Sequence, residues 1–142
     1  MSQDKIGVTH ENVIYSCAGG FANCGLISLI ACIEVVKELG FAKVSLGCLG
    51  AIPLNNQGVI NKTKAAKRII TVDGCANQCA KKIIENAGFT ITASIEVVKD
   101  IEIKKVPWHQ KIQENPKCFD EIISREDIEK VKKLIFRALE VI

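Results

Sequence analysis

Cysteine residues follow three short apolar segments of this chain, and a glycine stands close to each of them. These cysteines are Cys17, Cys48 and Cys75, and a fourth, Cys79, comes soon after the last. If the three segments are parallel strands of one sheet, their carboxyl ends lie along one edge, which is where open α/β sheets bind ligands. The sequence therefore predicts that four thiols converge at one edge of a sheet.

Four converging thiols suit two kinds of chemistry. Thiolate sulfur is a preferred ligand of soft metal ions, and four thiolates can hold tetrahedral zinc, at Zn–S distances of about 2.3 Å, or an iron–sulfur cluster. Thiols at such a place can also carry out disulfide exchange. The residues alone do not separate zinc from an iron–sulfur cluster, and they leave open whether the protein is an enzyme.

The spacing of Cys75 and Cys79 predicts a chelating pair. We expect a helix to begin at Cys75, which would place both thiols on one face of that helix, one turn apart. The N–H groups at a helix N-terminus favour negative charge and therefore favour thiolates. Asp73 is expected to cap this helix, and Gly74 to allow either a positive φ or a close approach of the backbone.

The other three of the seven cysteines have weaker claims to the site. Cys32 lies within an apolar stretch of helical periodicity, and we expect it to be a buried core residue. Cys118 stands in a polar segment far along the chain and is expected to take no part. Cys24 lies at the entry of the first predicted helix, and the sequence leaves open whether it is a fifth thiol of the site or packs in the core.

Composition favours one soluble, cytoplasmic domain. The chain has 142 residues, of which 48% are hydrophobic, so it can bury a core that needs no disulfides. Its net charge of +3 is spread along the chain with few aromatic residues, and no nucleic-acid surface is expected. The polar start lacks the core of a signal peptide, and the longest apolar stretch, 26–33, is too short to span a membrane. The protein partner, and whether the chain forms a homo-oligomer, are left open.

Periodicity predicts strands that alternate with helices. The expected strands are 13–16, 43–46, 68–72 and 89–98, and the expected helices are 25–39, 59–67, 75–87 and 125–142, the last of them capped by Ser124. Alternation of this kind indicates an α/β fold: a doubly wound, mainly parallel four-stranded sheet with helices on both faces, Rossmann-like or flavodoxin-like. Right-handed crossovers give the strand order 2-1-3, with Cys17 facing Cys75 at the switch point. We treat 1–142 as a single domain in which 125–142 is a C-terminal extension.

Three segments carry a pattern of known proteins: Tyr15-Ser16-Cys17-Ala18-Gly19, Cys48-Leu49-Gly50-Ala51-Ile52, and the run from Asp73 to Lys82 that begins Asp-Gly-Cys. In this order they resemble the DGC-domain family of small prokaryotic proteins, which are described as zinc-binding and have no agreed biochemical role. The resemblance covers about residues 14–98. It implies that Cys17, Cys48, Cys75 and Cys79 are the ligands. Some members have another cysteine where this chain has Gly20, and Cys24 is the candidate for that place, so the resemblance implies four or five ligands.

The sequence thus predicts a metal-binding protein whose cysteine cluster, at the carboxyl edge of a parallel sheet, holds zinc. Asp73 and Gly74 are expected to support the cluster without binding the ion. Two alternatives remain open at this stage: a thiol-based redox or sulfur-handling enzyme that uses Cys75 or Cys79, and an iron–sulfur protein. An interaction domain whose cysteines only pack is a third, less favoured interpretation.

Overall fold

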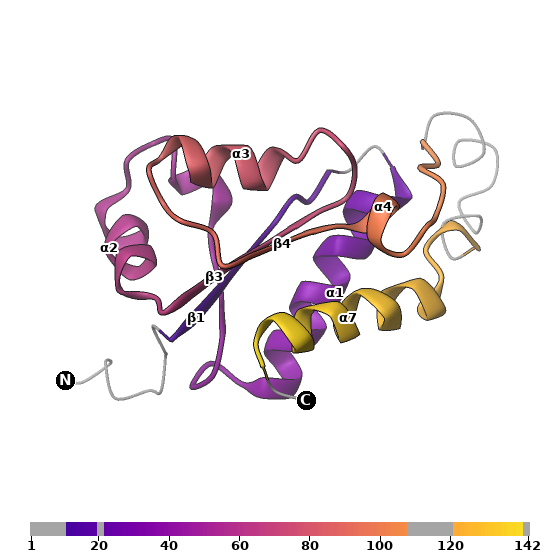
Figure 1. Cartoon of the computed structure of the whole chain (residues 1–142), viewed down its shortest axis with the longest axis horizontal. Helices are drawn as coiled ribbons and strands as arrows, with labels where there is room; N and C mark the ends of the chain where they lie inside the picture. The colour runs from indigo at the N-terminus through magenta and orange to yellow at the C-terminus, as the bar shows by residue number, and fades with distance from the viewer. Residues whose placement is uncertain (1–10, 20–21, 108–120, 141–142) are drawn as a thin grey trace.

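A parallel sheet forms the centre of the molecule. The computed structural model describes residues 11–19, 22–107 and 121–140. The strands are β1 (Asn12–Ser16), β2 (Ser45–Leu46), β3 (Arg68–Asp73) and β4 (Ala93–Glu96). All neighbouring strands pair in parallel, in the order β2-β1-β3-β4 (Figure 1). The predicted 2-1-3 order of the first three strands is confirmed.

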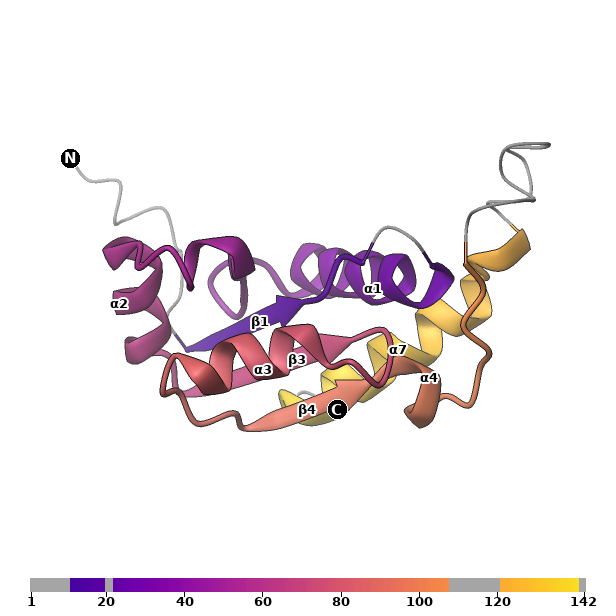
Figure 2. The same ribbon diagram turned by 90° about the horizontal axis from the view of Figure 1, so that it is seen from above.

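Helices cover both faces of this sheet. They are α1 (Asn23–Leu39), α2 (Gln57–Ala65), α3 (Cys79–Asn86), α4 (Val97–Asp100) and α7 (Arg125–Ala138), together with a short 3-10 helix, η2 (Leu49–Ala51). α1 and α7 lie on one face, and α2 and α3 on the other (Figures 1 and 2). The doubly wound α/β class predicted from the sequence is therefore confirmed.

The core has two parts because successive side chains of a strand point to opposite faces of the sheet. Ile14 and Ile70 pack with α1 and α7. Val13 and Tyr15, which flank Ile14 in the chain, pack with α2, α3 and η2. Every residue of β1 is buried, as expected for a central strand covered on both faces. In residues 11–19, 22–107 and 121–140, no helix is long and apolar enough to cross a membrane.

The start of α3 differs from the prediction. The helix begins at Cys79, four residues later than expected, and residues 75–78 form a turn in which Gln78 has a φ of 49°. The N–H of Gln78 donates to the carbonyl of Cys75 at 3.1 Å and closes this turn. The expectation that Cys75 and Cys79 lie one turn apart on a helix was therefore wrong. Cys75 precedes the helix because β3 continues through Asp73, so the chain needs these residues to reverse its direction.

Other elements also have bounds that differ from those expected. The fourth strand is shorter than 89–98, since α4 begins at Val97, where the Asp100 carboxylate accepts the N–H of Glu96 at 2.9 Å. α2 begins before residue 59 because the side chain of Asn56 accepts the N–H of Val59 at 3.1 Å. The last helix begins as predicted, and the Ser124 hydroxyl caps it. It ends at Ala138; residues 141 and 142, which were expected to be helical, lie outside the described residues.

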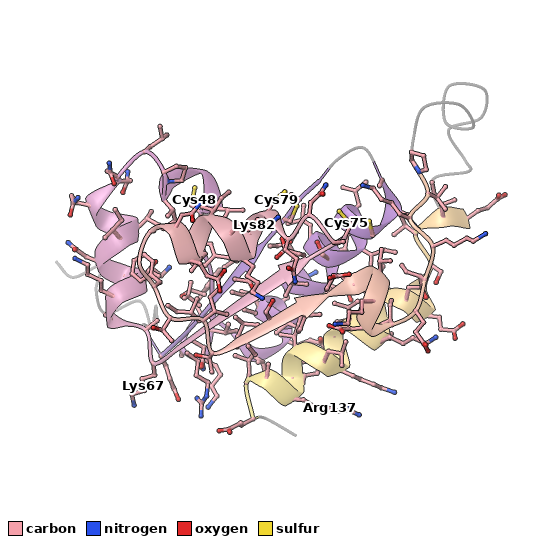
Figure 3. The ribbon with its side chains drawn as sticks, turned by 45° about the horizontal axis from the view of Figure 1, so that its top comes forward. Cys48, Lys67, Cys75, Cys79, Lys82 and Arg137 are labelled. Atoms are coloured by element: carbon pink, nitrogen blue, oxygen red, sulfur yellow. The ribbon has the colours of Figure 1, made fainter. Side chains whose placement is uncertain are left out.

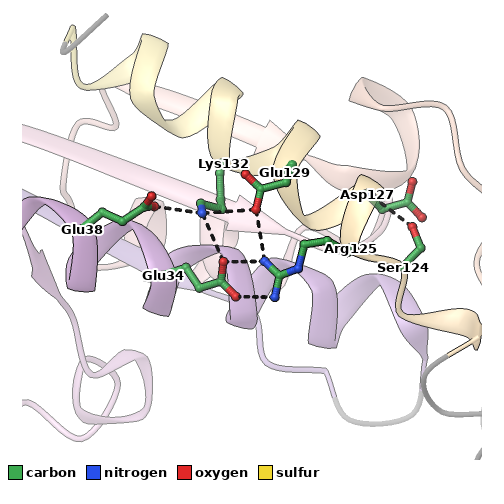
Figure 4. A network of polar contacts seen from close by, with 7 residues as sticks. All are labelled: Glu34, Glu38, Ser124, Arg125, Asp127, Glu129 and Lys132. Atoms are coloured by element: carbon green, nitrogen blue, oxygen red, sulfur yellow. Dashed lines mark hydrogen bonds and ion pairs between the residues drawn. The ribbon is translucent and has the colours of Figure 1, made fainter.

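An ion network joins α7 to α1 (Figure 4). Lys132 of α7, with only 7% of its side chain exposed, contacts Glu38 at 2.9 Å, Glu34 at 3.1 Å and Glu129 at 3.3 Å. Arg125 donates to both oxygens of Glu34, at 2.7 and 3.0 Å. These cations lower the pKa of Glu34 to about 2. The network fixes α7 beside α1, on the face of the sheet that α3 does not cover.

Candidate thiol site

One cavity lies at the carboxyl edge of the sheet, beyond the ends of β1 and β3. Its volume is about 200 Å³. Four cysteines line it, and we call it the thiol pocket: Cys17, Cys24, Cys75 and Cys79. The other lining residues are Gly19, Ala22, Gly25, Gly74, Asn77 and Lys105. Cys17 and Cys75, which were expected to face each other at the switch point, both line this pocket.

The membership of the thiol pocket differs from the predicted quartet at one position. Cys48, which is exposed, does not line the pocket, and Cys24, with 2% of its surface exposed, does. β2 lies at the outer edge of the sheet, with β1 between it and β3. In Figure 3, Cys79 lies between Cys48 and Cys75 along one edge of the molecule. Cys48 is thus at the predicted edge but outside the pocket.

The remaining cysteines are accounted for separately. Cys32 is fully buried within α1, as expected of a core residue. Its burial raises the pKa of its thiol to about 12. Cys118 lies outside the described residues.

Glycine allows the segments around the pocket to meet backbone to backbone. A Cβ on Gly74 would lie 2.7 Å from the nitrogen of Gly25 and 2.8 Å from the carbonyl carbon of Cys24. A Cβ on Gly25 would overlap the carbonyl oxygen of Gly19. Gly74 does not adopt a positive φ, so of the two roles expected for it, close approach of the backbone is the one found. The ends of β1 and β3 and the start of α1 are thereby held together around the thiols.

Asp73 holds the N-terminus of α3 against the end of β3. One of its carboxylate oxygens accepts the N–H of Ala80 at 2.7 Å, and the other accepts the N–H of Lys81 at 3.0 Å. Burial raises the pKa of Asp73, and these two N–H donors oppose that rise because they favour the charged form. Asp73 therefore caps α3, as expected, and fixes the position from which Cys79 faces the pocket.

Two of the pocket thiols, Cys17 and Cys24, have pKa values raised by their surroundings. Burial raises the pKa of Cys17, and negative charge on Cys79 and a hydrogen bond with that thiol raise it further. Burial likewise raises the pKa of Cys24. Negative charge on Cys75 raises this pKa further, and the ammonium of Lys105 lowers it. The protein surroundings thus favour neutral thiols at Cys17 and Cys24, and a bound cation would reverse that preference because it stabilises thiolates.

Lys105 is a residue of the pocket that could not be found by reading the sequence. Its ammonium nitrogen lies 3.6 Å from the sulfur of Cys75. It belongs to an irregular segment after α4, and Pro107 indicates a break in regular structure there but not where the segment lies in space. Only the path of the folded chain brings Lys105 back to the edge of the sheet.

The thiols line one cavity but do not form a compact group of ligands. Within the part of the chain that the structure describes, no three Cys, His, Asp or Glu side chains are grouped closely enough to hold a metal ion. Four cysteines from three separate segments nevertheless line one small cavity, and thiolate sulfur is a preferred ligand of soft metal ions.

Comparison with known proteins assigns the chain to a family. Curated proteins yield no match to it, and neither do solved structures. The family model of the DGC domain matches residues 13–135. This match covers most of the chain and extends beyond residue 98, where the recognisable motifs end, into α7. The chain therefore belongs to the DGC-domain family.

Proposed function

We propose that the thiol pocket binds a metal ion, that zinc is the physiological ion, and that Cys17, Cys24, Cys75 and Cys79 are its ligands. The observation that carries this proposal is the meeting of these four thiols at one cavity from three separate segments of the chain. Cysteine is common in protein cores, but chance packing does not account for four thiols at the edge of the sheet where α/β proteins bind ligands.

Chemistry favours zinc among the ions that thiols bind. Zn²⁺ has no geometric preference of its own and accepts four thiolates in a tetrahedral, closed site. Such a site would have a net negative charge, which the ammonium of Lys105 could partly balance. A compartment that keeps thiols reduced, such as the cytoplasm, would keep these four cysteines available as ligands.

A second function, thiol–disulfide chemistry, is favoured by the presence of Cys17 and Cys79 in the lining of one small pocket. Oxidation of this pair would join the two sulfurs and release two electrons and two protons to an acceptor such as glutathione disulfide. The two functions use the same residues but differ in what the purified protein contains.

Metal content and free thiols, measured together on protein purified without air, test the proposal. We expect about one zinc per chain, no iron or sulfide, and about four additional reactive thiols after chelation. Iron together with sulfide in the purified protein would show that the pocket holds an iron–sulfur cluster and not zinc. The absence of any metal, with a disulfide between Cys17 and Cys79 after exposure to glutathione disulfide, would overturn the proposal in favour of thiol–disulfide chemistry.

Cys24 and Cys48 provide a matched pair of substitutions. The family pattern implies that Cys48 is a ligand, whereas Cys24, and not Cys48, lines the pocket. We expect Cys24→Ser to lower zinc affinity at least tenfold and Cys48→Ser to leave it unchanged. Zinc affinity is measured by competition with a chromophoric chelator. The reverse result would restore Cys48 as the fourth ligand and remove Cys24 from the site.

A further inference from the structure

Lys105 is the one cationic side chain among the described residues that line the thiol pocket. Its ammonium lies 3.6 Å from the sulfur of Cys75 and also lowers the pKa of Cys24. A lysine ammonium is strongly hydrated and ordinarily faces water. Lys105 is exposed and keeps this hydration, so its position beside Cys75 has its cause in the backbone that carries it.

That cause is a clamp between Asn23 and residues 104–106. The backbone N–H of Asn23 donates to the carbonyl of Val106 at 3.0 Å. Its side-chain amide donates to the carbonyl of Lys104 at 3.0 Å and accepts the N–H of Val106 at 2.7 Å. Asn23 is 5% exposed, so water competes little for these three hydrogen bonds. The clamp fixes the backbone on both sides of Lys105 against the first turn of α1.

The result is a charge held at the mouth of the pocket by backbone contacts. Cys24, which follows Asn23 directly, lines the same pocket. A single turn of α1 thus supplies both a thiol and the anchor for the lysine. Lys105 is exposed as a whole, and its position depends on the segment that carries it.

We propose that Lys105 is a functional residue of the thiol pocket, which Asn23 positions so that its ammonium balances the negative charge on Cys75 when the pocket thiols bind a metal ion. This inference rests on the proposed function. Four thiolates around a divalent ion leave a net charge of about −2, and a cation within 4 Å of one sulfur stabilises part of that charge. For the same reason, the ammonium of Lys105 would attract an anionic reagent to the space beside Cys75.

The local charge at Cys75 can be tested without any metal. The metal-free protein is alkylated at one pH with iodoacetate, which is negatively charged, and with iodoacetamide, which is neutral, and modification of Cys75 is followed by peptide mass spectrometry. The ratio of the two rates reports the potential at the sulfur, because the thiolate fraction cancels. We expect Lys105→Met to lower the iodoacetate-to-iodoacetamide ratio about fivefold, and Lys105→Arg to restore it.

Lys82→Met is the matched control, because Lys82 is exposed on α3 and does not line the pocket (Figure 3). We expect this variant to keep the ratio of the unmodified protein. An unchanged ratio in Lys105→Met, or an equal fall in Lys82→Met, would overturn the inference.

Zinc affinity supplies the second readout. We expect Lys105→Met to weaken binding about fivefold, Lys105→Arg to bind as the unmodified protein does, and the stoichiometry to stay the same in both. Equal affinity in Lys105→Met would overturn the role in metal binding. If the unmodified protein bound no zinc, the proposed function would fail, whereas the alkylation ratio would still decide whether Lys105 sets the charge at Cys75.

Discussion

Gly74, the middle residue of the Asp-Gly-Cys motif, shows how the thiol pocket depends on a missing side chain. Its backbone lies against the first turn of α1, with no room for a Cβ. The atoms that a Cβ would meet belong to the backbone, which cannot turn aside as a flexible side chain could. The glycine of the motif therefore allows two segments to meet, while the aspartate before it and the cysteine after it have separate tasks.

Gly74→Ala is expected to lower the free energy of unfolding by about 1–3 kcal/mol, because the added methyl group must displace backbone at the pocket. Urea unfolding followed by circular dichroism measures the change. Gly50→Ala is the control, since a Cβ on Gly50 would meet no atom within 4 Å. If the two variants lost equal stability, the close packing of Gly74 on Gly25 would not be the cause.

The single residues of the site differ in how far sequence predicts them. A capping role for Asp73 was expected because aspartate is preferred at the start of a helix, but Asp73 acts from six residues before Cys79, and Gln78 holds the position next to the helix. Its two carboxylate oxygens accept the N–H groups of Ala80 and Lys81. These contacts depend on the turn at 75–78, which the apolar periodicity of the sequence does not predict. Lys105 and Asn23 could not be predicted, because their association joins segments that are distant in the sequence.

At the scale of elements, α7 shows how a helix rich in charged residues is held in place. One face buries Ile128, Val131 and Ile135 against the core. Beside that face, Lys132 reaches three carboxylates, two of them on α1. Burial of an ammonium is costly unless it is paired, so these contacts are needed for α7 to pack as it does.

Lys132→Met is expected to destabilise the protein by about 1–3 kcal/mol. Methionine keeps the apolar stem of the side chain but leaves Glu34 and Glu38 without this partner, and their partial exposure keeps the loss below that of a fully buried pair. Thermal and urea unfolding measure it. Lys130→Met is the control, because Lys130 makes only an exposed pair with Glu126, worth at most about 0.5 kcal/mol. Equal losses would show that the network adds nothing to α7.

The sequence predicted the elements better than their ends. The order of strands and helices follows from apolar periodicity, and the strand order follows from the handedness of the crossovers. The ends of α3, β4 and α2 were misplaced because side chains fix them: Asp73 and Asp100 accept backbone N–H groups, and Asn56 caps α2. Such contacts depend on where the side chain lies in the fold.

At the scale of the whole molecule, the buried thiol of Cys32 links folding to alkaline pH. The folded protein keeps this thiol protonated up to about pH 12, whereas in the unfolded chain the pKa has its ordinary value of 9.0. The stability that this group contributes is fully present below pH 9. It is lost as the pH rises from 9 towards 12, because only the unfolded chain then releases the proton.

Cys32→Ala should therefore flatten the alkaline fall in stability. Between pH 9 and 10.5, the free energy of unfolding is expected to fall more steeply in the unmodified protein, by up to about 1.4 kcal/mol per pH unit. Urea unfolding with a reducing agent at each pH measures the slope. Loss of the sulfur shifts the stability of the variant at every pH, so the slope is the test. Equal slopes in both proteins would contradict the assignment.

The clamp formed by Asn23 also sets an order in time. When synthesis has passed residue 79, the growing chain contains every thiol of the pocket, but the clamp partners of Asn23, Lys104 and Val106, have not yet been added. At about 5–20 residues per second, this interval is on the order of seconds. During these seconds the four cysteines are present without Lys105. The thiols of a nascent chain therefore have less positive charge beside them than those of the finished protein.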